Sequence, residues 1–458
     1  MVLVTPRSGV AVGIGEHSVY MRSVHELLYY YSFPFGRPGD DPGSVTLTKT
    51  RPAAVRDIAH ERRIITALFA AGLATFATMY SAQALLPSLS AEFGAAPAHA
   101  ALAVSLTTGV LALAIIPVSA LSSRIGRTRV MTVSALSSAA IGLLLPLSPS
   151  LDVLLAGRAL QGLTLAGVPA VAMAYLAEEI GAEGLGAAMG VYIAGTSMGG
   201  LAGRVIPAFT LGVGSWRWAE ASISVAAAVC TLWFVRGLPP SRGFVPQSAG
   251  IRTVVGDLVV QLRHRGLLAL FGLALVLVGG FVSLYNFLGY RLTQPPFELP
   301  SAVAGLVFVL YAAGSGASAV AGRLADRIGR QWVLAAAVLV MGIGLAMTLP
   351  DNLATLILGM ALCTAGFFGA HSVASGWVGA MAVGNRGAAS SLYLFSFYVG
   401  SAVIGGGSGI AYTHYGWTGL AASVGILLVV AAILVSALSI HATAARRSAS
   451  CAEAGQAA

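Results

Sequence analysis

Twelve long apolar segments dominate this sequence and restrict the folds that it can adopt. Their approximate ranges are 64–86, 101–121, 130–147, 151–176, 187–212, 219–237, 267–290, 302–321, 332–349, 353–382, 388–412 and 417–438. A helix of about 20 apolar residues spans the roughly 30 Å hydrocarbon core of a bilayer, so each segment is long enough to cross it. Helices are required there because no water satisfies an open backbone. The sequence therefore predicts an all-α integral membrane protein with twelve transmembrane helices.

The composition excludes several other classes of protein. Of the 458 residues, 57% are hydrophobic and only 9% are charged, whereas a soluble domain carries roughly 25% charged residues. The net charge of +9 comes mostly from arginines at the ends of apolar segments. No basic face with interleaved aromatic residues accompanies it, so we expect no nucleic-acid partner. Cys230, Cys363 and Cys451 have neither a disulfide nor a metal-ligand spacing. No segment carries paired carboxylates or a nucleophile with a base, so we expect neither an enzyme nor a bound metal or cofactor.

A short charged stretch occurs twice, each time between two apolar segments. The second copy contains Gly322, Asp326, Arg327, Gly329 and Arg330, and the first contains Arg124, Gly126 and Arg127. The arginines and the glycine of the first copy precede their equivalents by 203 positions, and the first and seventh apolar segments begin with the same offset. Such a repeat indicates a duplication. We therefore expect two pseudo-symmetric six-helix bundles, residues 64–237 and 267–440, joined by a polar linker at 238–266.

The pattern Gly322-x-Leu324-Ala325-Asp326-Arg327-x-Gly329-Arg330 resembles the cytoplasmic loop signature of the major facilitator superfamily, and the likeness covers about residues 60–440. The resemblance implies two bundles around a central cavity that work by alternating access. It also implies that glycines 322 and 329 allow a tight reversal and that Asp326 and the arginines act as a gate on the cytoplasmic side. Alternatively, the arginines only fix the topology. The first copy has Ser123 in place of the acid and Ser119 in place of the leading glycine.

The distribution of arginines predicts the orientation. Twelve arginines lie in the loops on one side, and only Arg217 and Arg291 lie on the other. Cytoplasmic loops are enriched in Lys and Arg, so we expect both termini in the cytoplasm and, given the family, a multi-pass protein of the bacterial inner (plasma) membrane. Residues 1–63 are expected to form a disordered cytoplasmic tail, with Met21 as an alternative start, and residues 441–458 a second cytoplasmic tail. Nothing in the sequence demands more than a monomer.

Arg158 lies inside the fourth apolar segment, with Gln161 and Gly162 on the same helical face. A charge inside the membrane is costly, so it normally faces the bundle interior or a water-filled cavity. The spacing resembles a fourth-helix motif of the superfamily, which implies substrate binding or proton coupling for Arg158. A structural tether is the alternative. The equivalent position in the second half is Ala361, so the charge belongs to one half only.

The fifth apolar segment carries Gly195, Gly199, Gly200 and Gly203 next to Arg204. Three of these glycines are spaced by four and share one face, which permits close contact between helices. The stretch resembles the glycine-rich fifth-helix motif of the drug:proton antiporter branch, although the usual proline is absent. Simple helix packing is the alternative to an exporter-specific role.

Polar and aromatic residues within the apolar segments are the candidates for a central substrate and proton cavity. They are Arg158, Gln161, Tyr80, Gln83, Tyr192, Arg204, Tyr285, Asn286, Tyr311, His371, Tyr393 and Tyr398. We expect some of them to line the cavity and the others to pack between helices. Two arginines without a carboxylate in the middle of any segment favour neutral or anionic solutes. Proton coupling would then depend on His371, on Glu220 or on the surroundings of Arg158.

These features predict a secondary active transporter, driven by the proton gradient, that exports a small neutral or anionic organic solute such as a drug, sugar or metabolite. Residues 285–292 and 366–372 resemble the bacterial drug:proton antiporter branch, including its arabinose-efflux-permease-like members. Two alternatives remain open. One is an importer of a sugar or organic acid, and the other is a non-transporting membrane sensor, which would predict a large structured soluble appendage.

Overall fold

The computed structural model describes residues 2–4, 10–14, 17–21, 58–180, 182–244 and 251–457. The chain divides into two compact units, Met1–His60 and Glu61–Ala458. In the first unit, β1 (Val2–Val4), β2 (Val10–Ile14) and β3 (His17–Met21) form an antiparallel sheet in the order β1-β2-β3. The prediction that this tail has no regular structure is therefore wrong for these residues, because the valines of the strands favour extended backbone. Residues 22–57 of the expected tail lie outside the described residues.

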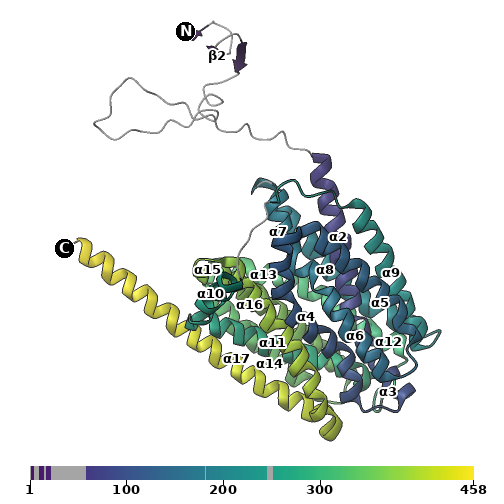
Figure 1. The fold of residues 1–458 in the computed structure, drawn as a ribbon. Coiled ribbons are helices and arrows are strands. Elements are labelled where there is room, and N and C mark those ends of the chain that lie inside the picture. Colours follow the sequence, from purple (N-terminus) through teal and green to yellow (C-terminus); the bar gives the residue numbers. More distant parts are fainter. Residues whose placement is uncertain are drawn as a thin grey trace. The chain divides into compact units, whose positions relative to one another are not determined.

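The second unit is a bundle of long helices that run side by side (Figure 1). The helices are α2 (Ile58–Tyr80), α3 (Leu86–Phe93), α4 (Pro97–Ile125), α5 (Arg127–Leu144), α6 (Leu151–Leu165), α7 (Gly167–Glu179), α8 (Ala182–Leu211), α9 (Trp216–Gly237), α10 (Ile251–Leu262), α11 (Arg265–Thr293), α12 (Ser301–Gly305), α13 (Tyr311–Ile328), α14 (Arg330–Met347), α15 (Leu353–Met381), α16 (Arg386–Val399) and α17 (Gly405–Ala457). Shorter 3₁₀ or π segments are η1 (Ser81–Ala84), η2 (Leu145–Leu147), η3 (Leu306–Leu310) and η4 (Gly400–Ile404).

Within the described residues, eleven helical stretches are long and apolar enough to cross a membrane. The last of them, Arg386–Ile440, has 55 residues, more than twice the roughly 20 that one crossing needs. Its backbone leaves the helical region at Gly416, where φ is 61° and ψ is −154°, and Figure 1 shows α17 bent back on itself. This stretch therefore makes two crossings, which gives the twelve helices that the sequence predicts.

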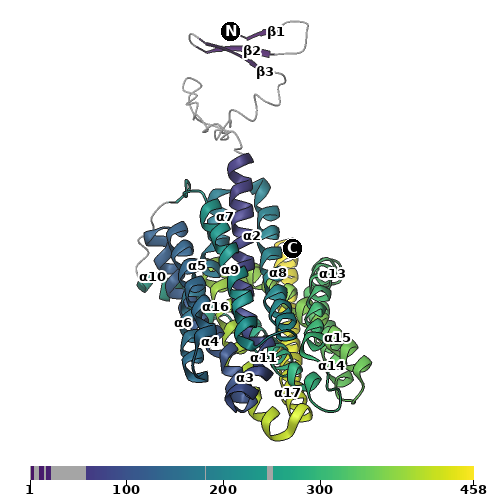
Figure 2. The same ribbon diagram turned by 90° about the vertical axis from the view of Figure 1, so that its right-hand side faces the viewer.

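The outer surface of the bundle is apolar. Among the large hydrophobic side chains that are more than 60% exposed are Leu113, Val133, Leu144, Leu339, Ile426 and Ile433. So much exposed apolar surface is unfavourable in water but suits contact with lipid chains. In Figure 2 the first-half helices α5 and α6 lie on the left and the second-half helices α13, α14 and α15 lie on the right, with α2, α8 and α11 between them.

The ends of several helices differ from the predicted ranges, and three differences change an assignment of the sequence analysis or a domain boundary. The first spanning helix, α2, begins at Ile58 and not at 64. The linker contains a helix, α10, and the C-terminal tail continues α17 as far as Ala457. Helices extend past the apolar residues because polar turns at the membrane surface keep their intrahelical hydrogen bonds.

The duplicated loops have the same backbone conformation. Gly126 separates α4 from α5 with φ 110° and ψ 139°, and Gly329 separates α13 from α14 with φ 99° and ψ 142°. A positive φ is costly for a residue with a Cβ, so glycine is favoured at both reversals. The two positions are 203 residues apart, which is the offset of the duplication. We call the side of the bundle with these two glycines the loop end.

Three departures from the α-helix surround the middle of the bundle. η1 continues α2, η3 precedes α13, and the π segment η4 separates α16 from α17. Such irregular turns redirect side chains and are frequent at functional sites in membrane proteins. Of the residues described next, Ser81 and Gln83 lie on η1, and Tyr311 directly follows η3.

Candidate functional site

The side chain of Arg204 lies in a cage of aromatic rings contributed by both halves. Its guanidinium carbon is 4.2 Å from the ring centre of Tyr80, 4.3 Å from that of Tyr311 and 5.9 Å from that of Phe308. Nε donates a hydrogen bond to Gln83 Oε1 at 2.5 Å, and Nη1 donates one to a carbonyl of its own helix. Only 1% of Arg204 is exposed. We call Tyr80, Gln83, Arg204, Phe308 and Tyr311 the Arg204 cage.

A cluster of aromatic rings adjoins the cage in the second half. The ring centre of Tyr311 is 4.8 Å from that of Tyr285 and 5.4 Å from that of Phe281. Phe281 stacks on Phe367 at 4.0 Å. The hydroxyl of Tyr285 is 2.7 Å from Thr364 Oγ1. The cage and the cluster form one continuous aromatic surface beside the guanidinium.

Gln83 also connects the two halves. Its Nε2 donates to Asn286 Oδ1 at 2.7 Å, and Asn286 Nδ2 donates to the Gly405 carbonyl at 3.1 Å. Further from the loop end, the hydroxyl of Tyr290 donates to the Leu86 carbonyl at 2.8 Å and lies 2.6 Å from Ser90 Oγ. In the described part of the chain, the remaining hydrogen bond between the halves runs from Ser401 Oγ to Thr108 Oγ1 at 3.5 Å. The side chains that join the halves by these hydrogen bonds are therefore not those of the repeated loops.

Arg158 forms a separate network inside the first half. Nε donates to the Ala103 carbonyl at 3.0 Å, and Nη2 donates to the Met79 carbonyl at 2.9 Å. Nη1 lies within hydrogen-bond distance of the Thr78 carbonyl (3.0 Å), of Gln161 Oε1 (2.7 Å) and of Ser81 Oγ (3.3 Å). The side chain is 1% exposed. In this conformation Arg158 ties α2, α4 and α6 together and does not face open solvent.

Glu220 of α9 completes the Arg158 network. Ser81 Oγ donates to Glu220 Oε1 at 3.3 Å, and Ser81 is also the residue that accepts from Arg158. Glu220 is 3% exposed and is connected to Arg158 through the Ser81 hydroxyl. The apolar ranges suggest only that Glu220 lies near a segment end; the packing of α9 on η1 brings its carboxylate close to the arginine.

Of the remaining predicted residues, Tyr192 belongs to α8 of the first half and the others lie in the second half. The Tyr393 hydroxyl is 2.9 Å from His371 Nδ1, and the His371 ring stacks on Phe367 at 5.8 Å. Tyr192 and Tyr398 are buried, and the ring centre of Tyr398 is 5.3 Å from that of Phe397. The predicted residues thus form three groups: the Arg204 cage with its neighbours, the Arg158 network and the His371 pair.

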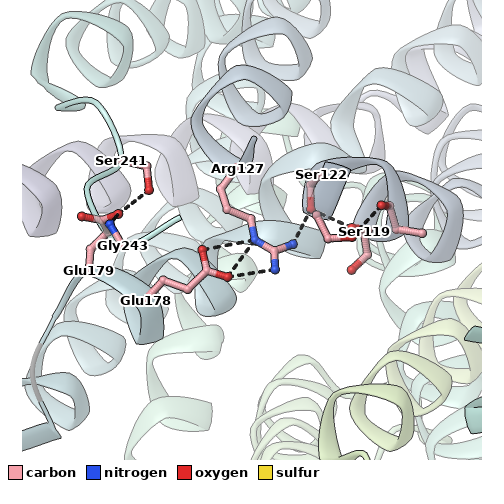
Figure 3. A network of polar contacts seen from close by, with 9 residues as sticks. Ser119, Ser122, Arg127, Glu178, Glu179, Ser241 and Gly243 are labelled. Atoms are coloured by element: carbon pink, nitrogen blue, oxygen red, sulfur yellow. Dashed lines mark hydrogen bonds and ion pairs between the residues drawn. The ribbon is translucent and has the colours of Figure 1, made fainter. Parts of the chain in front are cut away.

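At the loop end, the first copy of the repeated stretch forms an ion pair within its own half (Figure 3). Arg127 donates to Glu178 Oε1 through Nε at 3.0 Å and through Nη2 at 2.9 Å, and its Nη1 donates to Ser122 Oγ at 2.6 Å. The adjacent Glu179 accepts from the backbone N–H of Gly243 at 2.8 Å, at the start of the linker. The acid that this copy of the sequence pattern lacks is therefore supplied by α7.

The second copy is arranged differently from the prediction. Gly322 lies inside α13, two turns before the reversal, so only Gly329 makes the turn. The expectation for Gly322 is wrong because α13 continues without a break as far as Ile328. Within the described residues, Asp326 forms no hydrogen bond or ion pair. Its gating role stays a prediction.

The glycines of α8 face α2. A Cβ added at Gly195, Gly199 or Gly203 would lie 2.4, 2.3 or 2.3 Å from a backbone carbonyl oxygen of α2. Real Cβ atoms do not approach so closely, so these three positions need glycine for the two backbones to touch. Gly200 differs, since its carbonyl accepts the hydrogen bond from Arg204 Nη1.

Three contributors are not among the predicted site residues. Ser81 bridges Arg158 and Glu220, Phe308 forms part of the Arg204 cage, and Glu178 pairs with Arg127. Phe308 has a detectable signal, since it precedes Tyr311 by one helical turn. The other two owe their roles to contacts between distant segments. Among the described residues, no three His, Cys, Asp or Glu side chains lie close enough to hold a metal ion.

Comparison with known proteins assigns the family. The family model described as the Major Facilitator Superfamily matches residues 67–295 and 292–452. The chain is 39% identical to the MFS-type transporter YybF of Bacillus subtilis over 370 residues, which cover 81% of this chain and 92% of that one. It is 40% identical to the inner membrane transport protein YnfM of Escherichia coli over 399 residues, which cover 87% and 96%.

Solved structures share the fold at low sequence identity. A bacterial homologue of the human lysosomal transporter Spinster, in an inward-facing and occupied conformation, matches with a TM-score of 0.68 at 14% identity, covering 83% of this chain and 97% of that one. A D-xylose-proton symporter matches with a TM-score of 0.66 at 16% identity, covering 82% and 97%. With the two six-helix halves and the repeated loops, these matches show that the chain belongs to the Major Facilitator Superfamily and is a membrane transporter of that type.

Proposed function

We propose that this transporter exports a small neutral or anionic organic solute across the bacterial inner membrane in exchange for protons. The observation that carries the proposal is the buried carboxylate of Glu220, linked through Ser81 to the buried guanidinium of Arg158. In the proposed orientation the loop end faces the cytoplasm, because the loop arginines gather there.

Glu220 is suited to carry a proton. Burial disfavours the charged form of a carboxylate, whereas a nearby arginine favours that form. The protonation of Glu220 therefore responds to small changes in its burial or in its distance from Arg158. Within the described residues, the side chain has one hydrogen-bond donor, Ser81. Movement of α9 or of η1 would alter both the burial of the carboxylate and its distance from Arg158.

The 3₁₀ segment η1 offers a path from the proton site to the junction between the halves. Ser81, which contacts Glu220, and Gln83, which contacts Asn286, lie on the same short turn. Protonation of Glu220 removes the charge that Ser81 donates to. A shift of that turn would change the hydrogen bond between Gln83 and Asn286, one of those that join the two halves. Alternating access requires such a link between ion binding and the rocking of the bundles.

The direction of transport can be tested in everted membrane vesicles that contain the protein. With the interior made acidic, an exporter coupled to protons accumulates labelled neutral or anionic solutes, and a protonophore abolishes the accumulation. Arg158→Ala should abolish it as well, whereas Arg217→Ala, which changes an exposed arginine, should not. The amount of folded protein in each preparation is measured by gel filtration in detergent.

Two outcomes would contradict the proposal. Accumulation in right-side-out vesicles with an inward proton gradient, and none in everted vesicles, would make the protein an importer. Accumulation of cationic solutes alone, unchanged in Arg158→Ala, would contradict both the substrate class and the role of Arg158.

A further inference from the structure

We propose that the Arg204 cage binds the oxyanion of an organic acid whose aromatic or apolar body rests on the ring cluster of Tyr285 and Phe281. This inference names the substrate class of the proposed transport function and rests on it. The ligand would be a carboxylate or a sulfonate attached to a ring or a short apolar chain.

The first argument is the charge of Arg204. Its side chain is 1% exposed, yet among the described residues no Asp or Glu forms an ion pair with it. A buried charge normally has a partner of opposite sign, because removal from water is unfavourable. The rings of Tyr80 and Tyr311 offset part of that penalty. The missing partner is an anion.

The contrast with Arg158 sharpens this argument. Arg158 has acceptors for all three guanidinium nitrogens and a carboxylate, Glu220, near by. Arg204 Nε donates to the side-chain amide oxygen of Gln83, and Nη1 donates to the carbonyl oxygen of Gly200. In the described structure, Nη2 has no acceptor. Of the two buried arginines, Arg204 is the one that keeps a free donor for a ligand.

The second argument is the hydroxyl group of Tyr311. This oxygen is buried, and none of the residues that the structure describes forms a hydrogen bond with it. Buried polar atoms are nearly always hydrogen-bonded, so such an atom is evidence for a ligand or water. The Tyr311 hydroxyl, like the free Arg204 nitrogen, can donate a hydrogen bond, and a carboxylate accepts from several donors at once.

The third argument concerns the body of the ligand. The ring of Tyr311 meets Tyr285, Phe281 and Phe368 with centre-to-centre distances of 4.8, 5.4 and 5.8 Å. These rings offer apolar contact and no charge, so they suit an aromatic or aliphatic group and disfavour a second charged group. The combination of one cationic group and an apolar wall matches an amphiphilic organic anion.

The fourth argument is the position of the cage between the halves. Tyr80, Gln83 and Arg204 belong to the first half, and Phe308 and Tyr311 belong to the second. A pocket lined by Gln83, Ala208, Gly305 and Phe308 adjoins the cage on the side away from the loop end. A ligand held by groups from both halves meets different partners when the halves rock, as alternating access requires.

The test measures binding without a gradient, using purified full-length protein in detergent and isothermal titration calorimetry. The ligands are phenylacetate, the neutral phenylacetamide and the cation phenethylammonium. We expect the wild type to bind phenylacetate more tightly than either of the others. Arg204→Gln should weaken phenylacetate binding by about tenfold or more, because a charge-assisted hydrogen bond is lost. Tyr311→Phe keeps the ring and should weaken binding by about threefold to tenfold. The matched control, Arg217→Gln, should leave it unchanged.

Several results would overturn the inference. They are equal binding of phenylacetate by Arg204→Gln and the wild type, tighter binding of the cation than of the anion, and no binding of phenylacetate by folded wild-type protein. If Arg204→Gln does not fold, Tyr311→Phe decides the question with the same three ligands. Because no gradient is used, this test is independent of proton coupling. Arg204-dependent binding of phenylacetate without proton-driven uptake would support the cage and contradict the proposed coupling. Proton-driven uptake without Arg204-dependent binding of phenylacetate would support the coupling and contradict the cage.

Discussion

Gln83 and Asn286 are hydrogen-bonded to each other at 2.7 Å and lie 203 positions apart. This is also the offset between Gly126 and Gly329 at the loop end. A residue and its own repeat equivalent can meet only close to the axis that relates the two halves. The pair therefore marks that axis, and the Arg204 cage lies beside it through the hydrogen bond from Arg204 to Gln83.

Fixing the junction between the halves should stop transport. A Cβ added at Gly212 would be 3.1 Å from the Cβ of Ala302, a few tenths of an ångström short of the roughly 3.5–4.5 Å found across disulfides. In a background with Cys230, Cys363 and Cys451 changed to Ser, we expect oxidation of Gly212→Cys/Ala302→Cys to abolish uptake and reduction to restore it. The disulfide is quantified by mass spectrometry. Full uptake by the oxidised protein would show that the halves do not separate here.

Two glycines of the same helix should respond in opposite ways to alanine. In Gly199→Ala the new Cβ would lie 2.3 Å from the Leu73 carbonyl oxygen, so we expect the free energy of unfolding to fall by about 1–3 kcal/mol. Gly190 has nothing within 4 Å of such a Cβ, so Gly190→Ala should raise it by about 0.5–1 kcal/mol, since alanine favours a helix. Unfolding is followed by circular dichroism in detergent. Equal effects at both positions would contradict the packing described for α8 and α2.

The Arg127–Glu178 ion pair should contribute measurably to stability. The side chains of Arg127 and Glu178 are only 11% and 27% exposed and share three hydrogen bonds, so we expect Glu178→Gln to lower the free energy of unfolding by about 1–2 kcal/mol. Glu92→Gln breaks the ion pair with Arg217, whose side chains are more exposed, 47% for Glu92 and 39% for Arg217. This substitution should lower the free energy of unfolding by less than about 1 kcal/mol. The same thermal measurement compares them, and a larger loss in Glu92→Gln would argue against this ranking.

Asp326 should matter for the transport rate and not for the stability of the conformation described. The structure gives this carboxylate no hydrogen bond or ion pair within its described part, so Asp326→Asn should leave the midpoint of thermal unfolding unchanged. If the carboxylate binds a partner only when the loop end closes, the substitution should slow uptake by about fivefold or more. Asp351→Asn, which removes the partner of Arg291, is the control at another loop. Uptake by Asp326→Asn at the wild-type rate would contradict the gating role and support the alternative that this loop only fixes the topology.

Much of the fold, but less of the site, can be predicted from the sequence. The apolar ranges and the repeated loop identify twelve spans and two halves because hydropathy and glycine reversals are local properties. Close packing at Gly195, Gly199 and Gly203 follows from a spacing of four on one helix. Local signals also identify most members of the site, including Arg158, Arg204 and Gln83, because polar residues in apolar spans are conspicuous.

The contacts among those residues depend on how distant segments meet. Ser81 is one polar residue among many until α9 brings Glu220 beside it. Glu178 lies in a different loop region from Arg127, 51 positions away, and so nothing in the sequence pairs them. The separation of Arg158 and Arg204 into two sites also arises from packing. In sequence they look alike, as single arginines inside apolar helices.

The most direct test of the account is the effect of Glu220→Gln on two kinds of transport in everted vesicles. The amide resembles a protonated carboxyl group but cannot release a proton. The account predicts that accumulation driven by the proton gradient is lost, while exchange of labelled for unlabelled solute across the membrane continues. Glu92→Gln should retain both. Gradient-driven accumulation at the wild-type level in Glu220→Gln would contradict the claim that Glu220 couples protons to transport.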